Sequence, residues 1–210
     1  MQQKFVLKQW DQQGFSLVEI LITLTIISLV MAGLFTSFRG QQQSHLSQVQ
    51  TVEMQQTARG TLYIMSKEIR MAGYDPDGDN DTGIIAAGDG SSVDNAFTFS
   101  YVFAESDDEP GEVRTISFYL YDAYGDGDGN DGLGRSVDGS LQPLADNVQD
   151  LDFVYLDSDN NTTTDLDDIR AVEIQITTQV AHDAVDHTLG EDTQVTRTVR
   201  TVVNCRNLGF

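Results

Sequence analysis

The longest apolar run of the chain lies near its N-terminus, between Phe15 and Phe38. It contains one charged residue, Glu19, and it follows a polar segment, residues 1–14, that carries Lys4 and Lys8. As a helix, the 24 residues of the run would extend about 36 Å, enough to cross a hydrocarbon core of about 30 Å. Lysines before the run favour an N-terminus in the cytoplasm and the bulk of the chain outside. A secretory signal fits poorly, because the run is long and no A-x-A-like site follows it.

The polar segment that begins at Arg39 keeps a helical spacing of apolar residues. No proline occurs before Pro76, and Gly73 with the following Asp75-Pro76 is a stop signal. We therefore expect one continuous helix from about Phe15 to about Ala72, with its second half against a globular head, residues 75–210. The residues that recur at spacings of three and four are Leu46, Val49, Val52, Leu62, Met65 and Ile69.

The head has the alternating pattern of β-strands. Five segments are rich in β-branched and aromatic residues, and Gly- and Asp-rich turns separate them. We expect an α+β fold, in which the long helix packs on an antiparallel sheet. We expect the strand aromatics to belong to the core or to the sheet surface rather than to form a platform for a ligand; they include Phe97, Phe99, Phe118, Tyr119 and Phe153. The five segments are Ala96–Phe103, Val113–Tyr121, Leu151–Leu156, Ile169–Val180 and Thr193–Cys205.

Charge is distributed very unevenly. The formal net charge of the 210 residues is −21, and between Asp75 and Asp192 there are 29 acids and only three bases. Such a surface does not bind nucleic acid through phosphates, which needs clusters of Lys and Arg. The carboxylates of such a surface either repel one another in water or are neutralised by cations.

A single cysteine, Cys205, excludes an intrachain disulfide. Its position near the end of a predicted strand favours a small buried residue. An intermolecular disulfide or a reactive thiol is the alternative.

The start of the apolar run resembles the processing site of type IV prepilins. The sequence Gly14-Phe15-Ser16-Leu17-Val18-Glu19 has a glycine, then a phenylalanine, then a glutamate at the fifth position after the glycine. The resemblance implies that a prepilin peptidase cuts after Gly14 and N-methylates Phe15. It also implies that Glu19 pairs with the N-terminal amine of a neighbouring subunit and sets the register of assembly. A lone carboxylate in a membrane is costly and seldom unpaired, which agrees with that role; an interfacial carboxylate without a partner is the alternative.

Three other stretches resemble PilW-type minor pilins. They are the predicted end of the helix, Leu62–Gly78, and the segments Asn147–Ile176 and Arg200–Phe210. The J-type pseudopilin of type II secretion is the nearest competing family. Thr36 stands where major pilins usually carry a proline, and this difference also favours a minor pilin or a pseudopilin.

The loop Asp157–Asp168 is the best candidate for a cation site. Its side-chain oxygens recur at positions 1, 3, 5, 7, 9 and 12, as in an EF-hand. The sixth position is Thr162 rather than glycine, the last ligand is an aspartate rather than a glutamate, and the flanks are predicted strands. A calcium site and a solvated acidic turn both stay open. The candidate ligands are Asp157, Asp159, Asn161, Thr163, Asp165 and Asp168.

Two further acidic loops are weaker candidates for calcium. One, residues 125–134, offers Asp126, Asp128 and Asn130. It also contains a formal G-x-G-x-x-G, but without a βαβ unit and with aspartates that would repel a pyrophosphate. The other, residues 75–83, carries four aspartates but has Ala86 at the twelfth position.

No sequence motif predicts an enzyme. His45 lies on the predicted helix, where we expect it at the surface, and His182 and His187 have no zinc-site spacing. No serine lies in a nucleophile elbow, and paired carboxylates carry little information in so acidic a surface.

The sequence therefore predicts an assembly protein with four parts. They are a cleaved leader (1–14), a transmembrane and assembly helix (15–38), an amphipathic helix (39–74) and the acidic β-rich head (75–210). By its resemblance, it is expected to be held in the inner membrane with its head in the periplasm, and then to enter a type IV pilus to prime or cap its assembly. Its expected partners are other pilins, through the helix, and prepilin peptidase. A J-like pseudopilin and a calcium-dependent adhesive module at the pilus tip are the alternatives.

Overall fold

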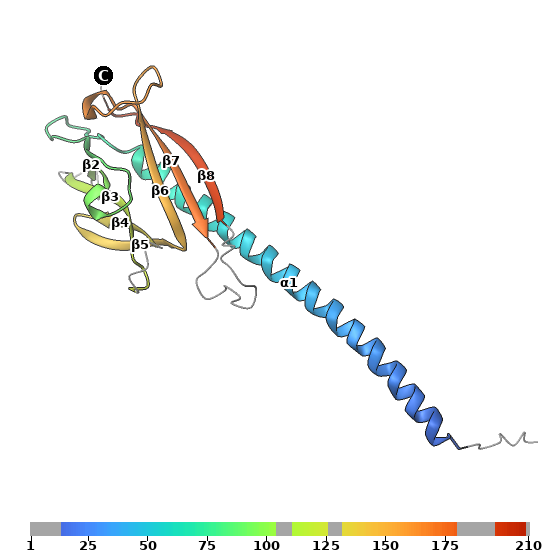
Figure 1. Cartoon of the computed structure of the whole chain (residues 1–210). Coiled ribbons are helices and arrows are strands. Elements are labelled where there is room, and N and C mark those ends of the chain that lie inside the picture. Colours follow the sequence, from blue (N-terminus) through green and yellow to red (C-terminus); the bar gives the residue numbers. More distant parts are fainter. Residues whose placement is uncertain (1–13, 104–110, 126–131, 180–195, 209–210) are drawn as a thin grey trace, which may run out of the picture. The chain divides into compact units, whose positions relative to one another are not determined.

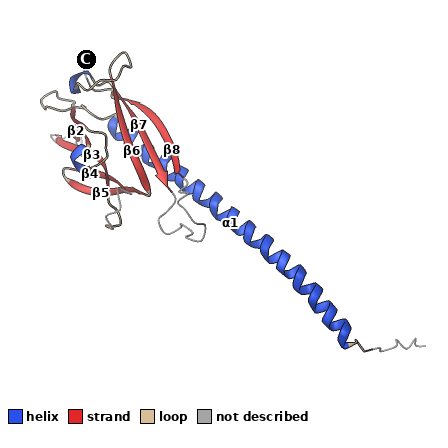
Figure 2. Ribbon diagram, viewed as in Figure 1, coloured by secondary structure: helices blue, strands red, loops and turns tan. Residues whose placement is uncertain are grey.

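The computed structural model describes residues 14–103, 111–125, 132–179 and 196–208. Within these ranges the chain forms one long helix and eight strands (Figures 1 and 2). The chain divides into two compact units, Met1–Gln48 and Val49–Phe210. The elements are α1 (Leu17–Ile69), β1 (Ile84–Ala87), β2 (Phe97–Phe103), β3 (Glu112–Tyr121), β4 (Gly132–Val137), β5 (Ser140–Asp146), β6 (Val148–Leu156), β7 (Ala171–Gln179) and β8 (Thr196–Asn204), with short 3-10 helices η1 (Val93–Asn95) and η2 (Leu166–Asp168).

The first unit consists, in its described part, of the N-terminal portion of α1. Every described residue from Gly14 to Leu46 is exposed. An 18-residue window of α1 has a mean hydropathy of 2.4, and none of it is buried. The helix is thus long and apolar enough to cross a membrane, and no described part of the chain covers this apolar surface. Thr36, at the position where major pilins carry proline, leaves the helix unbroken and donates its Oγ1 hydroxyl to the carbonyl of Ala32 at 2.9 Å.

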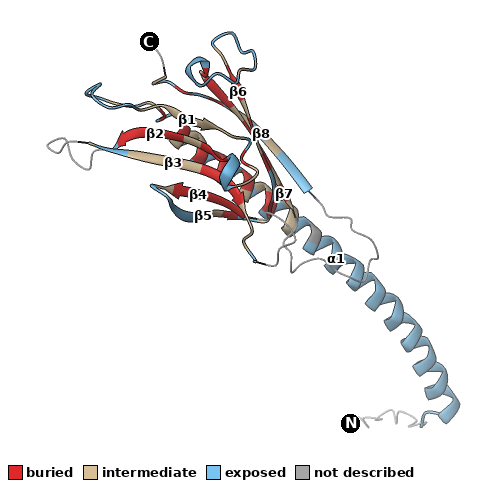
Figure 3. Ribbon diagram, turned by 60° about the vertical axis from the view of Figure 1, so that its left-hand side comes forward, coloured by how far each residue is buried: buried red, intermediate tan, exposed pale blue. Residues whose placement is uncertain are grey.

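The second unit holds two antiparallel sheets, one with five strands in the order β1-β2-β3-β4-β5 and one with three in the order β6-β7-β8. The sequence predicted one sheet. The two sheets and the C-terminal part of α1 turn their buried faces toward a common core (Figure 3). The helix contributes Leu62, Met65 and Ile69, which are buried as the spacing predicts. Each such side chain contributes about 1.5–3 kcal/mol when it leaves water.

Aromatic side chains fill the centre of this core. Phe97, Phe99 and Phe118 are fully buried, and the ring of Phe97 lies 5.1 Å from that of Phe153 and 5.4 Å from that of Tyr155. These spacings are in the favourable range for tilted aromatic pairs. Of the two locations predicted for the strand aromatics, core or sheet surface, the structure shows the core: Phe97, Phe99, Phe118, Tyr119 and Phe153 are all buried.

Two predictions about the helix need correction. Leu46, Val49 and Val52 are exposed rather than buried, and the first residue of the helix that the structure shows to be buried is Met54. The helix also ends at Ile69, three residues before the predicted end. The reason is a tight turn, in which the Met71 amide donates to the Glu68 carbonyl (2.8 Å) and the Ala72 amide to the Ile69 carbonyl (3.1 Å).

The glycine of the stop signal completes this turn. Gly73 has φ +76°, and a Cβ there would lie 2.6 Å from Leu208 Cδ2 and 3.0 Å from the Asn207 carbonyl oxygen. Its amide donates to the carbonyl of Ser100 in β2. Only glycine combines a left-handed backbone with so close an approach of the C-terminal residues.

Candidate functional site

The glycine and phenylalanine of the predicted processing site lie just before α1. Gly14 is exposed, and a Cβ built on it would meet nothing within 4 Å. Phe15 is 79% exposed. The fold itself therefore needs neither a glycine at position 14 nor an aromatic residue at position 15, so a recognition event outside the fold is the simpler reason for both.

Glu19 lies in the first turn of α1. Ser16 precedes the helix, and its carbonyl accepts from the amide of Ile20 at 3.2 Å. Ser16 and Glu19 have the S-x-x-E spacing of a capping box, a signal that the sequence reasoning missed, and a carboxylate in the first turn also complements the helix dipole. Within the described residues, however, the Glu19 side chain forms neither a hydrogen bond nor an ion pair.

The predicted calcium loop is organised by its first aspartate. Asp157 Oδ1 accepts from the amides of Asp159 and Asn161, both at 2.8 Å, and the Asn161 amide, followed by that of Asp159, holds the pKa of Asp157 below its usual value. Thr163 Oγ1 accepts from the amide of Asp165, and Asp165 caps the short helix η2. Three of the six predicted ligands thus already hold the backbone of the loop.

Among the described residues, no group of three or more His, Cys, Asp or Glu side chains lies in a metal-binding arrangement. Asp159 and Asp168 are exposed. Calcium binding by this loop therefore stays a prediction. The structural role of Asp157, an aspartate that accepts from amides two and four residues ahead, was readable from the Asp-x-Asp-x-Asn sequence as an Asx turn.

The acidic loop of residues 75–83 is also organised by its first aspartate. Asp75 Oδ2 accepts from the amide of Asn80 at 2.7 Å, and this hydrogen bond is the main reason why the pKa of Asp75 is lowered. The weaker candidates Asp126, Asp128 and Asn130 lie outside the described residues. So do His182 and His187, whereas His45 is exposed on α1 as predicted.

Cys205 is buried, with 5% of its surface exposed. Burial raises the pKa of its thiol to about 12, so the thiol is neutral at physiological pH. The prediction of a small buried residue is confirmed, and a buried neutral thiol is poorly suited to an intermolecular disulfide.

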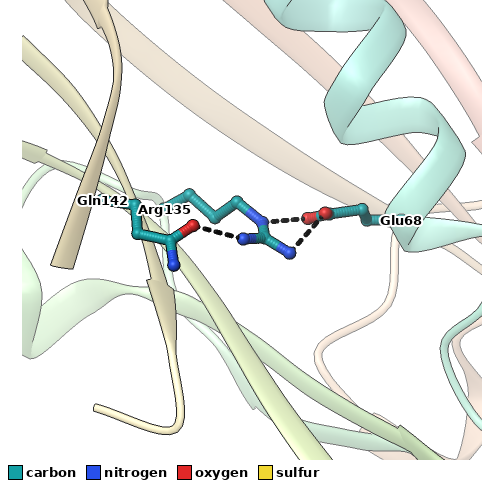
Figure 4. Close-up of polar contacts among 3 residues, drawn as sticks. All are labelled: Glu68, Arg135 and Gln142. Carbon is teal, nitrogen blue, oxygen red and sulfur yellow. Dashed lines mark hydrogen bonds and ion pairs between the residues drawn. The ribbon is translucent and has the colours of Figure 1, made fainter. Parts of the chain in front are cut away.

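A polar contact that the sequence did not reveal joins α1 to the five-stranded sheet (Figure 4). Arg135 in β4 donates from Nε to Oε2 of Glu68 at 2.7 Å, and its Nη2 lies 2.6 Å from Oε1. Its Nη1 donates to Gln142 Oε1 in β5 at 2.6 Å. Both charged side chains are about four-fifths buried, so this bidentate pair fixes the end of the helix against β4 and β5.

A small cavity of about 50 Å³ lies between α1 and the ends of β5 and β7. Its lining contains no His, Cys, Ser or Lys; the residues are Gln50, Glu53, Met54, Thr57, Asp146, Asn147, Thr178 and Gln179.

Comparison with known proteins finds similarity in the N-terminal segment and in the fold. The family described as the prokaryotic N-terminal methylation motif matches residues 11–35. No curated protein sequence matches the chain significantly. Among solved structures, a type IV-like pilin from Thermus thermophilus is similar in fold, with 11% sequence identity and a TM-score of 0.50 over 73% of this chain and 97% of that chain.

The motif match covers the site built from Gly14, Phe15 and Glu19, and the structural likeness covers most of the chain. At 11% identity the likeness concerns the fold alone. The chain thus carries a prokaryotic N-terminal methylation motif at residues 11–35, and it is similar in fold to a type IV-like pilin.

Proposed function

We propose that the chain is a minor pilin, PilW-like in type, which primes or caps the assembly of a type IV pilus. In this proposal prepilin peptidase cuts after Gly14 and methylates the new amino group of Phe15. The apolar part of α1 holds the protein in the inner membrane with its head in the periplasm. From there the protein enters the pilus.

The observation that carries the proposal is the carboxylate of Glu19, which has no partner among the described residues and lies in the exposed, otherwise uncharged segment from Phe15 to Phe38. A charge in that position costs several kcal/mol in a membrane unless it is paired. Cleavage after Gly14 creates an amine at Phe15, four residues away, and every neighbouring subunit would carry the same amine. Pairing of the Glu19 carboxylate with the amine of the next subunit neutralises both charges and permits only one axial register.

Two features favour a minor over a major subunit. Thr36 leaves the helix without the proline of major pilins, and the segments Leu62–Gly78, Asn147–Ile176 and Arg200–Phe210 resemble PilW-type proteins. A J-like pseudopilin of type II secretion has the same leader and helix. Genes for other minor pilins beside this one would favour a pilus, whereas genes for a secretion ATPase and secretin would favour the pseudopilin.

The first test is the mass of the N-terminal peptide of the protein isolated from its native envelope. We expect a peptide that begins at Phe15 and is one methyl group heavier than its sequence. In Gly14→Arg the fold should be unchanged, because a side chain at position 14 has open space, but the leader should stay attached. An unmodified Met1 terminus in the parent protein would overturn the proposal.

A second experiment separates the pilus from the alternatives. The processed protein should be found in sheared pili, and its deletion should reduce their number. Loss of secreted enzymes with normal pili would instead identify a pseudopilin.

The calcium-dependent adhesive alternative has its own readout. It requires target binding that chelation abolishes, and Asp165→Asn together with Asp168→Asn should abolish it in the same way. If calcium changes neither the melting temperature nor the binding of the head, calcium has no role in the Asp157–Asp168 loop.

A further inference from the structure

In the part of the chain that the structure describes, the two sheets have four edge strands, and three of them are protected against the addition of a further strand. β1 has only four residues and a register shift against β2. β5 contains Pro143, and its pairing with β4 also has a register shift. β6 has a register shift against β7, and its last residue, Leu156, forms a bridge with Thr162. Short strands, prolines, bulges and covering loops are the usual means by which proteins keep an edge from pairing with another chain.

The fourth edge strand, β8, has none of these features. It is nine residues long and pairs with β7 in an uninterrupted register. It contains no proline, glycine or lysine, and six of its nine residues are threonine or valine, types that are favoured in strands. Six of the nine are also exposed (Figure 3). β8 is therefore the edge at which a further strand meets the least resistance.

The direction of the backbone groups of β8 follows from one hydrogen bond. Thr178 in β7 donates from Oγ1 to the carbonyl of Arg197 at 3.3 Å, so the backbone groups of Arg197 face β7. Successive residues of an antiparallel strand direct these groups to opposite sides. The amides and carbonyls of Thr198, Arg200 and Val202 therefore point away from β7, and within the described residues no backbone hydrogen bond joins them to another segment.

Charge limits what can pair with this edge. β8 and the turn after it, residues 196–208, carry Arg197, Arg200 and Arg206 and no acid, on a chain whose net charge is −21. Glu173 pairs with Arg200 at 3.0 Å, but the Arg200 side chain stays 62% exposed. Arg197 forms no ion pair within the described residues. Because these two arginines are three positions apart, they lie on opposite faces of the sheet.

The same arginines distinguish between two kinds of added strand. A second copy of β8 would bring cations beside cations, because β8 has no acid, and like charges on paired strands are destabilising. A strand with carboxylates on both faces would instead meet a cation on each face. Val202, which is 50% exposed, offers such a strand an apolar contact as well.

We propose that the free edge of β8 receives an extended, acidic segment of another protein, which becomes the fourth strand of the three-stranded sheet. The outward backbone groups of Thr198, Arg200 and Val202 hold the segment, and Arg197 and Arg200 select it by charge. In this kind of recognition, main-chain hydrogen bonds supply the affinity and side chains supply the specificity. The contact involves the head alone, so it goes beyond the proposed minor-pilin function and does not require it.

Peptide binding to the full chain in detergent tests this contact. The probe is a fluorescent peptide of nine residues, in which threonine and valine alternate and two glutamates stand three positions apart. Its control has lysine in place of both glutamates. We expect the glutamate peptide to bind at least tenfold more tightly, as measured by fluorescence anisotropy. It should also slow hydrogen exchange at the amides of Thr198, Arg200 and Val202 at least tenfold, and leave the amide of Val199, which faces β7, unchanged.

Variants of β8 separate backbone pairing from charge. Thr198→Pro removes an outward amide, which an edge strand tolerates, and it should weaken binding of the glutamate peptide at least tenfold. Thr198→Val is the matched control, because it loses only the contact of the hydroxyl with Thr177 (2.9 Å), and its affinity should stay within twofold of the parent. Arg197→Glu with Arg200→Glu should reverse the preference, so that the lysine peptide binds more tightly.

A folded head is checked in each variant by the melting temperature and by the protection of the buried Cys205 from alkylation. If Thr198→Pro does not fold, the exchange of the outward amides and the charge reversal still decide the question.

Four results would overturn the proposal. The first is no binding of the glutamate peptide, and the second is equal binding of the two peptides. The third is binding that leaves the exchange of the outward amides unchanged, because the peptide would then lie elsewhere. The fourth is a slowing of the same amides by the protein alone as its concentration rises, which would identify a second copy as the occupant. A short single-stranded DNA that displaces the peptide and binds more tightly would identify a polyanion instead.

Discussion

Replacing Arg135 by methionine removes the ion pair that fixes the end of α1 to the five-stranded sheet. Glu68 then keeps a negative charge in a place where its side chain is only 18% exposed. Breaking a fully buried pair costs about 3–5 kcal/mol, whereas an exposed pair contributes at most about 1 kcal/mol. Because this pair lies between those limits and is bidentate, we expect a loss of about 2 kcal/mol in the free energy of unfolding.

The loss is measurable as a shift of the melting temperature of the full chain in detergent. For a unit of 150–250 residues, 1 kcal/mol corresponds to roughly 2–4 °C, so Arg135→Met should melt roughly 4–8 °C lower. The partner variant Glu68→Met should cost less, since Arg135 keeps its hydrogen bond to Gln142. In the double variant no charge is left unpaired, and its stability should lie within about 1 kcal/mol of the parent.

A double-mutant cycle over these four proteins isolates the interaction. A coupling energy of at least about 1 kcal/mol is expected for two side chains in direct contact. Arg197→Met, which removes an exposed arginine, serves as the control and should change the melting temperature little. If the losses in the free energy of unfolding of the two single variants merely add, or if neither variant loses measurable stability, the ion pair does not stabilise the fold as argued here.

Four further outcomes follow from the structure. Glu19→Ala and Glu19→Gln should both be processed normally but form few pili; if only Gln assembles, the carboxylate acts through helix capping and not through its charge. Gly73→Ala should lower the free energy of unfolding, measured by urea titration, by about 1–3 kcal/mol. The loss should exceed that of Gly78→Ala, because Gly78 has a similar φ of +71° but open space where a Cβ would lie. Equal losses in the two variants would contradict the close approach of Leu208 to position 73. The thiol of Cys205 should resist alkylation at neutral pH in the native protein and react fully in denaturant, because its pKa is raised to about 12; rapid native labelling would contradict its burial. The pKa of Asp157 is lower in the folded state than in the unfolded chain. The contribution of Asp157 to stability is therefore complete above the unfolded pKa of about 3.9, and it disappears as the pH falls through the folded pKa. In Asp157→Asn, the difference in melting temperature between about pH 6 and about pH 3 should be smaller than in the parent protein.

The sequence predicted the long helix and five of the strands because their patterns are strong and local. The three missed strands have weak patterns for reasons that the structure explains. β1 has only four residues, and β5 contains Pro143, which is tolerated because β5 is an edge strand. β4 contains Gly132 and Gly134, which look like turn residues in the sequence.

In the structure these two glycines make room for neighbouring side chains. A Cβ at Gly132 would lie 2.8 Å from the ring of Tyr121, and one at Gly134 would lie 2.5 Å from Leu141 Cδ1. Such close packing cannot be inferred from the sequence, because it depends on which strands pair. The same holds for the ion pair of Glu68 with Arg135, whose members are 67 residues apart.

The methylation motif at residues 11–35 was predictable because its pattern is contiguous in the sequence. The acidic loops were not predictable to the same degree. The oxygen spacing of Asp157–Asp168 suits a cation, but it also suits a loop whose carboxylates hold its own amides, as Asp157 does. A spacing pattern alone does not distinguish these two uses.

The contact between the end of the helix and the end of the chain bears on the order of folding. Asn207 donates from its side chain to the carbonyl of Arg70, 137 residues earlier, and β8 completes the three-stranded sheet. The head therefore cannot complete its fold until its last residues are available; if the chain is inserted in the membrane as proposed above, its apolar helix can be anchored before that point. Domains rich in such distant contacts fold slowly, in milliseconds to seconds. Under the proposed function, each molecule therefore passes through a period in which its helix is anchored and its head is unfolded, and during that period a protease or chaperone of the periplasm can act on it.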